Sequence, residues 1–522
     1  MPSPLYAALL AITLAGSLCA QSTQPAAATA WPSFVGPDAS RTPAPTGLKL
    51  VDDLQHIKPA WVLKRHMGVG KGLYPRQLQA ARAMGIEPFY GGTASPIVAE
   101  GLVFLSYYKP DGKHPADRKG WRTMAEPDKL ALLPDWFYSV TADDITIAVD
   151  LKTGALRWEA VEAGKGLNRL AHKRDHVSLT PAYANGRVFV HGSLGRVYAY
   201  EATTGKRLWE TPPSPFLQKV RDDHIAARKL CWQNNQESGL QVAGDVVIVS
   251  NGSLTAYDQK TGQLRWQTAA KTSVQSNTGT PLVWRHRGRD YLLARDSVST
   301  ARLIDPADGQ VLWTLPALGP ELGTPAIVDD VLIVNGTSEH AVIAEGGMRS
   351  GKPGWVLHAG YQLSLEGARK LWSLPDTHDY WHAWTADKGA RFRITGREGV
   401  AFLVVNRAKE SQAKHGGPDY CLLRLDIKTG RVLEKQDISK LDISQLYWLE
   451  DRLLTINDDA HSNPVDVSWW DAGGPKLRPL NERINLPHYT ITGYIVNIQY
   501  PYIDGLLICR SMEGLHCYDL RK

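Results

Sequence analysis

Apolar and polar residues alternate along most of this chain with a period of two residues. In the segment 187–210, RVFVHGSLGRVYAYEATTGKRLWE, Val188 and Val190 fall on one face, and two tyrosines repeat the spacing a few residues later. A period of two is typical of half-buried antiparallel strands and excludes an amphipathic helix here. A Thr-Gly pair then supplies a turn before a further short strand that ends on Trp209. The segment therefore predicts a small sheet that ends on a large aromatic side chain.

The same unit returns as AVDLKTGALRW, LTAYDQKTGQLRW and LIDPADGQVLW. Glu434 replaces the terminal tryptophan of the sixth unit, and the seventh, from Gln445 to about Leu480, lacks the Thr-Gly turn. A repeat of this length predicts a radial array of small sheets, so we expect an all-β chain folded as a single eight-bladed β-propeller. Seven blades are the alternative, if the seventh unit is an excursion from its neighbour. The first five units end at Trp158, Trp209, Trp266, Trp313 and Trp372.

The last unit, from Tyr489 to Leu520, supplies only three strands before the chain ends. A matching fourth strand occurs near the start, in KPAWVLK at residues 58–64, where Trp61 stands in the place of the terminal tryptophan. Pairing this strand with the last blade would close the ring and remove two open sheet edges. We therefore predict closure by an N-terminal strand.

The chain begins with an apolar run from Leu5 to Leu18 that contains no charged side chain, as a secretory signal peptide does. The run is shorter than a membrane-spanning helix, so we predict no transmembrane segment. We expect a periplasmic or secreted protein with a signal peptide at 1–20, a linker and N-terminal extension at 21–57, and the propeller at 58–522. A lipid anchor on Cys19 is the less favoured alternative, because Leu18 replaces the small residue that precedes an anchored cysteine.

The repeat opening S/T-P-x-V-x-x-G-x-V-x-V, the D/E-x-x-T-G turn and the terminal tryptophan together resemble the PQQ-like, or quinoprotein-type, β-propeller repeat family. The stretch WPSFVGPDASRT, residues 31–42, also resembles the opening of secreted members of that family. The resemblance implies the propeller fold, but the fold hosts dehydrogenases, assembly scaffolds and other enzymes. Quinoprotein alcohol dehydrogenases typically place a vicinal disulfide over the quinone, and this chain has no Cys-Cys pair. We therefore expect no bound PQQ.

Charge and cysteine content restrict the remaining possibilities. The net charge is +6 and the basic residues are scattered, which argues against a nucleic-acid partner and favours acidic ligands. A turn centred on Glu513 would set Cys509 opposite Cys517 across a hairpin. The sequence leaves two interpretations open, a cross-strand disulfide or two buried thiols.

Polar and aromatic residues interrupt the repeat at or just before the inner strands, whose starts surround one mouth of the central channel. Histidines from separate blades beside a carboxylate could bind a divalent metal, or could act with a tyrosine as general acid and base. We predict that these residues converge in one axial cavity. The candidate catalytic residues are His176, His378, His382, His488, Tyr380 and Tyr489.

The segment DTHDYWHAWTADKGARFRITGRE, residues 376–398, is the most distinctive part of this set. Its aromatic alternation favours an inner strand over a helix. Indole rings could stack on a sugar ring while arginines pair with a carboxylate or sulfate. The candidate substrate-binding residues are Trp381, Trp384, Arg393, Arg397, Asn277 and Glu321.

Two functions are consistent with these patterns. The first is a secreted carbohydrate-active enzyme, such as a lyase that cleaves an acidic polysaccharide or oligosaccharide at the axial His/Tyr/Glu cleft, and the insertions at 109–136 and 346–360 favour this hypothesis because they could cover a pocket. The second is a non-catalytic binding or assembly scaffold of the PQQ-like repeat group. A quinoprotein dehydrogenase is a third, less favoured alternative. The sequence favours an enzyme without establishing one.

Overall fold

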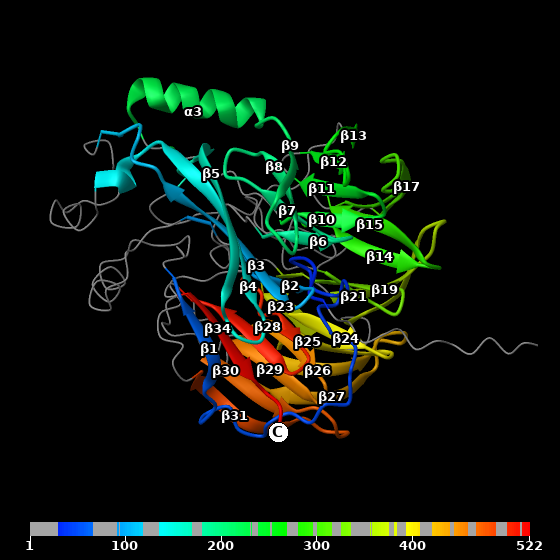
Figure 1. The fold of residues 1–522 in the computed structure, drawn as a ribbon. Coiled ribbons are helices and arrows are strands. Elements are labelled where there is room, and N and C mark those ends of the chain that lie inside the picture. Colours follow the sequence, from blue (N-terminus) through cyan, green and yellow to red (C-terminus); the bar gives the residue numbers. More distant parts are fainter. Residues whose placement is uncertain are drawn as a thin grey trace, which may run out of the picture.

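The computed structural model describes most of the chain between residues 30 and 522. The described residues are 30–65, 91–92, 94–117, 135–169, 180–229, 231, 239–250, 253–268, 280–295, 300–315, 325–335, 355–356, 358–374, 380–383, 393–407, 420–438, 443–457, 466–486, 498–511 and 514–522. Within them the chain forms eight antiparallel sheets arranged around a ring (Figure 1). The predicted eight-bladed, all-β propeller is therefore confirmed, and the seventh unit is a blade of its own.

The first four blades follow the chain in order, each with its strands in sequence from the inner to the outer edge. Blade 1 contains β2 (Ile97–Ala99), β3 (Leu102–Pro110), β4 (Thr141–Asp150) and β5 (Leu156–Leu167). Blade 2 contains β6 (Ala182–Ala184), β7 (Arg187–His191), β8 (Val197–Glu201) and β9 (Arg207–Glu210). Blade 3 contains β10 (Gln241–Ala243), β11 (Val246–Ser250), β12 (Leu254–Asp258) and β13 (Leu264–Gln267). Blade 4 contains β14 (Leu282–His286), β15 (Arg289–Arg295), β16 (Ala301–Ile304) and β17 (Val311–Leu315).

Among the remaining blades, blade 6 has additional strands and blade 8 includes a strand from the start of the chain. Blade 5 contains β18 (Ala326–Val328), β19 (Val331–Asn335), β21 (His358–Leu363) and β22 (Ala368–Ser373). Blade 6 contains β20 (Trp355–Val356), β23 (Tyr380–Ala383), β24 (Ile394–Arg397), β25 (Val400–Arg407), β26 (Tyr420–Asp426) and β27 (Val432–Asp437). Blade 7 contains β28 (Ile443–Leu449), β29 (Arg452–Asn457), β30 (Asp466–Asp471) and β31 (Arg478–Asn485). Blade 8 contains β32 (Tyr502–Ile503), β33 (Leu506–Arg510), β34 (Gly514–Asp519) and the N-terminal strand β1 (Pro59–Lys64).

The N-terminal strand closes the ring as predicted. β1 pairs antiparallel with β34, and Trp61 lies opposite Cys517 in this pairing. Figure 1 shows the blue β1 beside the red β34, although these strands come from opposite ends of the chain. This pairing covers an edge of β34 that would otherwise be open to other chains.

The terminal tryptophans join neighbouring blades. The indole nitrogen of Trp158 donates a hydrogen bond to the carbonyl oxygen of Ala202 in the next blade, at 2.8 Å. The same indole ring rests on Gly205, where an added Cβ would lie 2.6 Å from the ring and where φ is +72°. Glycine is therefore required at this turn both for its backbone conformation and for the close approach of the ring. The same hydrogen bond is made by Trp61, Trp209, Trp266, Trp313 and Trp372.

In the sixth blade, Glu434 occupies the position of the terminal tryptophan. Its carboxylate accepts a hydrogen bond from the backbone nitrogen of Leu477 in blade 7, at 2.6 Å. A polar contact to the neighbouring blade thus replaces the indole contact.

The predicted pairing of Cys509 with Cys517 is wrong by one residue. Cys509 lies opposite His516, and Cys517 lies opposite Ile508. Neighbouring residues of a strand point to opposite faces, so this register does not place the two cysteines as a directly opposed pair. Both are buried free thiols, and burial raises the pKa of each.

One helix and a short 3-10 turn lie beyond the end of blade 1, where β3, β4 and β5 extend past the ring (Figure 1). The helix α3 (Pro215–Ala227) buries Leu217 and Val220 against this extension, and η2 (Asp135–Tyr138) adds Tyr138 to the same core. Across the described part of the chain, no helix is long and apolar enough to cross a membrane.

Candidate functional site

A segment before β1 lies among the inner strands at the centre of the ring. Trp31 forms backbone hydrogen bonds with Val98 of blade 1, and the carbonyl oxygen of Pro32 accepts one from Tyr183 of blade 2 at 2.8 Å. Farther along, the carbonyl oxygen of Ala39 accepts a hydrogen bond from Ile327 of blade 5. In Figure 1 this dark blue segment runs over the inner strands before it reaches β1. We call residues 31–47 the axial segment.

The axial segment continues to blades 6 and 7. Arg41 is fully buried and donates a hydrogen bond to the carbonyl oxygen of Ile394 at 2.6 Å, and burial lowers the pKa of its guanidinium to about 10. The hydroxyl of Thr42 lies 2.6 Å from that of Thr395. The carboxylate of Glu450 accepts hydrogen bonds from the backbone nitrogens of Thr46 and Gly47. The axial segment thereby fastens several blades to one another across the ring.

Sequence reasoning assigned these residues to a linker and N-terminal extension and missed their place at the centre. The signal was present in the motif itself, because Trp31, Phe34 and Val35 form an apolar group that a solvated linker would not carry. All three side chains are buried.

Most of the predicted axial residues fall on parts of the chain outside the described ranges. His176, Asn277, Glu321, His378, Trp384, His488 and Tyr489 are in this group. Their convergence in one cavity therefore stays a prediction.

Tyr380, Trp381 and His382 lie on β23, where the backbone is described and the side chains are not. β23 pairs with β25, and Tyr380 lies opposite Arg407. β24 pairs with the other half of β25, so both strands lie along the inner side of that strand. The expectation of a strand over a helix is confirmed for these residues.

Arg393 and Arg397 are the predicted site residues whose side chains the structure describes. The Nε of Arg393 donates a hydrogen bond to the carbonyl oxygen of Ile443 at 2.8 Å, and its guanidinium lies 4.7 Å from the ring centre of Tyr420. The guanidinium of Arg397 lies 4.3 Å from the ring of Trp448, and it donates a hydrogen bond to the carbonyl oxygen of Glu450. Burial lowers the pKa of Arg397. These contacts tie β24 to blade 7, and a role in substrate binding remains a prediction.

The structure also shows a buried polar cluster between blades 1 and 2 that the sequence did not reveal. The carboxylate of Asp144 accepts hydrogen bonds from the backbone nitrogen of Ser193 at 3.0 Å, from its hydroxyl at 2.6 Å, and from the hydroxyl of Tyr198 at 3.2 Å. Burial raises the pKa of Asp144 to about 6, although these hydrogen bonds act in the opposite direction. In the sequence, Asp144 interrupts the apolar strand TADDITIAVD, and this interruption could have indicated a buried carboxylate.

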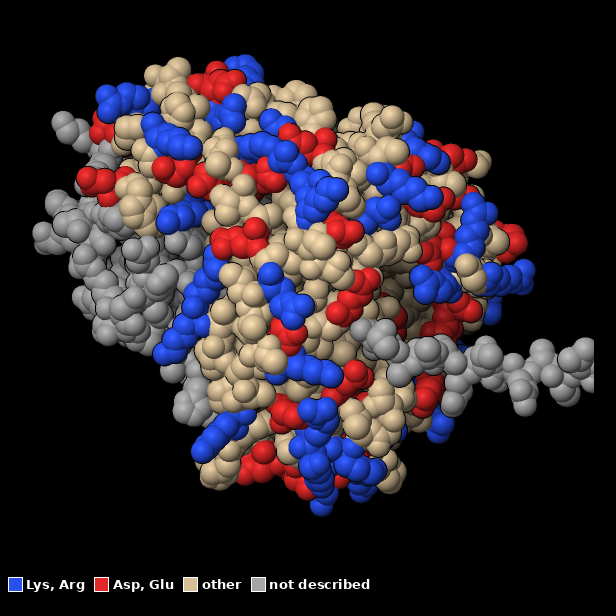
Figure 2. All heavy atoms as spheres, viewed as in Figure 1, with Lys and Arg blue, Asp and Glu red and all other residues tan. Residues whose placement is uncertain are grey.

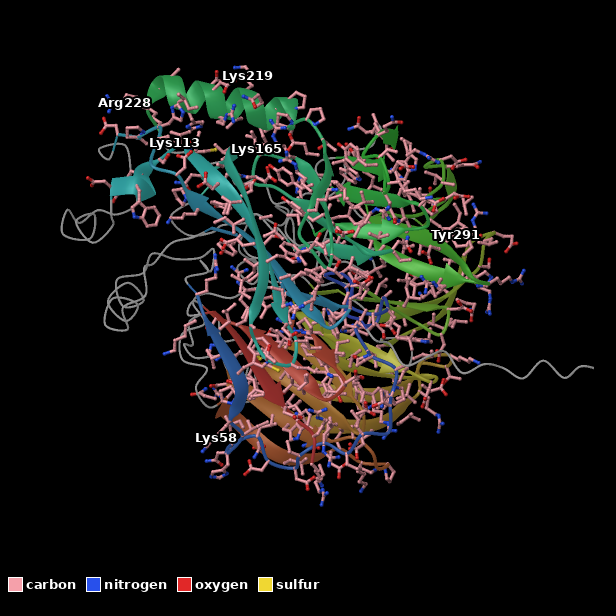
Figure 3. All side chains as sticks on the ribbon, viewed as in Figure 1. Lys58, Lys113, Lys165, Lys219, Arg228 and Tyr291 are labelled. Carbon is pink, nitrogen blue, oxygen red and sulfur yellow. The ribbon has the colours of Figure 1, made fainter. Side chains whose placement is uncertain are left out.

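Glu162 extends this cluster toward the surface. Its carboxylate accepts a hydrogen bond from the hydroxyl of Tyr200 at 3.2 Å and lies 2.9 Å from the ammonium of Lys165. Arg207 pairs with the same carboxylate. Figure 3 shows Lys165 on the extended part of blade 1, below α3. Glu162 of blade 1 thus forms an ion pair with Arg207 of blade 2, and a second ion pair with Lys165 of its own blade.

Neither a metal site nor a quinone site is supported by the described residues. No group of three or more His, Cys, Asp or Glu side chains in the described ranges is placed to hold a metal ion. Cys231, Cys421, Cys509 and Cys517 are free and buried, and none adjoins another in the sequence. The residues present therefore do not fit the vicinal disulfide that the dehydrogenase resemblance implies.

Comparison with known protein families gives a match over part of the chain. The family described as outer membrane protein assembly factor BamB matches residues 142–395. That range begins within β4 of blade 1 and ends within β24 of blade 6, so it covers the regular repeats.

Two characterised relatives cover different shares of the chain. The outer membrane protein assembly factor BamB of Yersinia pestis is 24% identical over 327 residues, which is 60% of this chain and 71% of that protein. The dehydrogenase subunit of a quinone-dependent alcohol dehydrogenase from Komagataeibacter europaeus is 30% identical over 143 residues. That match covers 25% of this chain and only 18% of the dehydrogenase subunit.

Among solved structures, BamB from Moraxella catarrhalis aligns with a TM-score of 0.44 and 15% sequence identity. The alignment covers 71% of this chain and 90% of that one.

Proposed function

Because this chain belongs to the PQQ-like β-propeller repeat family, we propose that it is a non-catalytic scaffold that binds protein partners during outer-membrane protein assembly. The observation that carries the proposal is the extent of the similarity to the assembly factor, which spans 60% of this chain and 71% of the relative. The similarity to the quinone-dependent dehydrogenase subunit covers only 18% of that protein, as a shared repeat would.

The outer rim of the ring supports a role in protein binding. The outermost strand of a blade has one edge that pairs with no strand of its own sheet, and such an edge can accept a strand from another protein. Leu264 on β13 is 59% exposed and Leu208 on β9 is 42% exposed. Further apolar side chains are exposed on the outermost strands, at Leu156, Val161, Val311 and Leu433. These side chains lie on the outer strands of five different blades, so each gives a partner an apolar contact beside the open edge of its own blade.

The charge distribution on the visible face also suits a protein partner. Figure 2 shows basic and acidic residues interspersed over this face. A mixed surface favours partners that present both signs of charge. The proposed location is the periplasmic side of the outer membrane, with the lipid-anchored and freely soluble forms both compatible with the scaffold role.

The polysaccharide lyase hypothesis rests on histidines outside the described ranges, and the relatives described above give it no support. The comparisons favour the scaffold alternative over it. The two hypotheses predict different results in one purified sample. A lyase releases unsaturated ends from acidic polysaccharides and raises the ultraviolet absorbance, whereas a scaffold leaves the absorbance unchanged.

The proposal is tested by deleting the gene in its natural host and measuring the amounts of folded outer-membrane barrel proteins. We expect these amounts to fall and to be restored by the wild-type chain. A variant with Leu208→Glu and Leu264→Glu should restore the amounts of barrel proteins less well than the wild type. The control variant Lys219→Glu, which changes an exposed residue of α3 away from the rim strands, should restore these amounts fully. Unchanged barrel amounts in the deletion strain, together with lyase activity of the purified protein, would replace the scaffold proposal by the enzyme hypothesis.

A further inference from the structure

A cavity of about 370 Å³ lies between the axial segment and the inner strands of blades 2 to 5. Val35, Gly36 and Asp38 of the axial segment form one wall. The opposite wall contains Trp284 of blade 4 and Asp330 from the turn of blade 5. The volume is within the range of small-ligand sites in proteins.

The cavity occurs where the axial segment leaves the inner strands. In blades 2 and 5, Tyr183 and Ile327 each donate a backbone hydrogen bond to the axial segment. Each of these residues stands two positions before the turn that follows its inner strand. Val242 of blade 3 and Arg285 of blade 4 occupy the same position, and both line the cavity. In blades 2 and 5 this position of the inner strand is therefore covered by the axial segment. In blades 3 and 4 the same position lines the cavity instead.

Asp38 of the axial segment is one of the residues that line this cavity. Its Oδ1 accepts hydrogen bonds from the backbone nitrogens of Ser40 at 2.9 Å and Thr42 at 3.1 Å, and from the hydroxyl of Ser40 at 2.8 Å. Among the described residues no hydrogen bond reaches Oδ2, and the residue is exposed although it lies at the centre of the ring. Desolvation by the surrounding protein raises the pKa of Asp38, although its hydrogen bonds with Ser40 and Thr42 and the nearby Arg41 act in the opposite direction. A cation in the cavity would offset the cost of keeping this carboxylate ionised.

The opposite wall combines a second carboxylate with an aromatic ring. The Oδ1 of Asp330 accepts a hydrogen bond from the indole nitrogen of Trp284 at 2.7 Å, which fixes the ring beside the carboxylate. Trp284 packs against Tyr291, with ring centres 5.7 Å apart, and Tyr291 is labelled on the green sheet in Figure 3. Arg285 on this wall already pairs with Asp290 at 2.9 Å. The Nδ1 of His286 lies 3.6 Å from the Oδ1 of Asp330, the same oxygen that accepts the indole hydrogen bond. The cavity thus combines a carboxylate of the axial segment with a carboxylate of blade 5, and charge-assisted pairing with carboxylates is the chemistry that recognises organic cations.

We propose that this cavity is a binding site for a compact organic cation, in which Asp38 and Asp330 pair with a guanidinium or ammonium group and Trp284 contacts its apolar part. A molecule of amino-acid to dipeptide size fits the volume. The site is independent of the scaffold function, because it lies at the centre of the ring and the scaffold surface lies on the rim.

The test uses N-acetyl-L-arginine amide as the probe and N-acetyl-L-citrulline amide as its neutral counterpart, with binding to the full mature chain measured by calorimetry. Asp38→Asn and Asp330→Asn each remove a charge and keep an acceptor oxygen for the internal hydrogen bonds. Asparagine also tolerates the positive φ of 63° at Asp330. Asp504→Asn, in the corresponding turn of blade 8, is the matched control.

We expect saturable binding of the arginine derivative, weaker binding of the citrulline derivative, and a loss of about tenfold in affinity for each cavity variant. The control should bind like the wild type. Absence of saturable binding, equal binding of the two derivatives, or unchanged affinity in both cavity variants would each overturn the proposal. If Asp38→Asn does not fold, Asp330→Asn alone decides the outcome.

Discussion

The indole nitrogen of Trp61 lies 2.8 Å from the carbonyl oxygen of Leu151 and donates a hydrogen bond to it. The same ring rests on Gly154, where an added Cβ would lie 2.7 Å away. Trp61 belongs to the last blade and Leu151 to the first, so this contact completes the ring of blade-to-blade contacts. Ring closure therefore involves a residue that precedes the first blade in the sequence.

Replacing Trp61 by alanine should destabilise the whole ring. The side chain is 8% exposed, and removal of a buried tryptophan costs about 3 to 5 kcal/mol in the free energy of unfolding. Trp61→Phe should cost less, because it keeps most of the apolar area and loses the hydrogen bond. Urea unfolding of the two variants and the wild type measures the difference. A Trp61→Ala variant as stable as the wild type would contradict closure through this contact.

Deletion of residues 21–65 tests closure at the level of the whole strand. It removes β1 and the axial segment together, and so exposes the edge of β34. We expect a sharply lower melting temperature and concentration-dependent association. A truncated protein that melts like the mature chain would show that neither segment holds the ring closed.

Glu434→Ala should weaken the contact between blades 6 and 7. The substitution leaves the backbone nitrogen of the buried Leu477 without its acceptor, at a cost of about 1 to 3 kcal/mol. Glu434→Gln keeps an oxygen at the same place and serves as the control, with a smaller effect. Equal losses in the two variants, measured by denaturant unfolding, would mean that the hydrogen bond is not the cause.

Asp144 should make stability depend on pH. Because the pKa is raised from 3.8 to about 6, the folded state holds the proton more tightly than the unfolded state. The cost of ionisation is therefore absent well below the unfolded pKa, grows as the pH rises between the two values, and is complete above the folded pKa. The difference in pKa corresponds to about 3 kcal/mol.

Asp144→Asn removes this cost while its amide oxygen can still accept the hydrogen bonds from Ser193. The free energy of unfolding of the variant relative to the wild type should therefore rise by up to about 3 kcal/mol between about pH 4 and about pH 7.5. A relative stability that does not change over this interval would show that Asp144 keeps an ordinary pKa. Asp143→Asn, at the neighbouring position of β4, is the control.

The axial histidines give a prediction that does not depend on the scaffold proposal. If His176, His378, His382 and His488 converge in one cavity, single alanine variants should lose binding of an acidic oligosaccharide. Their melting temperatures should stay near that of the wild type, because the contacts between blades involve the terminal tryptophans. Wild-type binding in all four variants would remove these residues from any ligand site.

The contacts that repeat along the chain were predictable from sequence, and the contacts that occur once were not. KPAWVLK carries the same tryptophan as the other units, so the partner of β34 could be inferred. The register of Cys509 depends on the number of residues in a single turn, and a change of one residue shifts every pair. Asp38 could not be placed in a cavity, because its position follows from the path of the axial segment across the ring. Long-range packing of this kind leaves no periodic pattern in the sequence.

The central claim, binding of a protein partner at the outer rim, is tested most directly by crosslinking in living cells. A photoreactive amino acid in place of Leu264, on the open edge of β13, should form adducts with a component of the outer-membrane assembly machinery. The same amino acid in place of Lys219, on the exposed face of α3, is the control and should give no such adduct. Adducts from position 264 that contain the assembly component would support the scaffold. Their absence at position 264 and at the other exposed rim positions, in a protein that is folded and present at normal amounts, would contradict it.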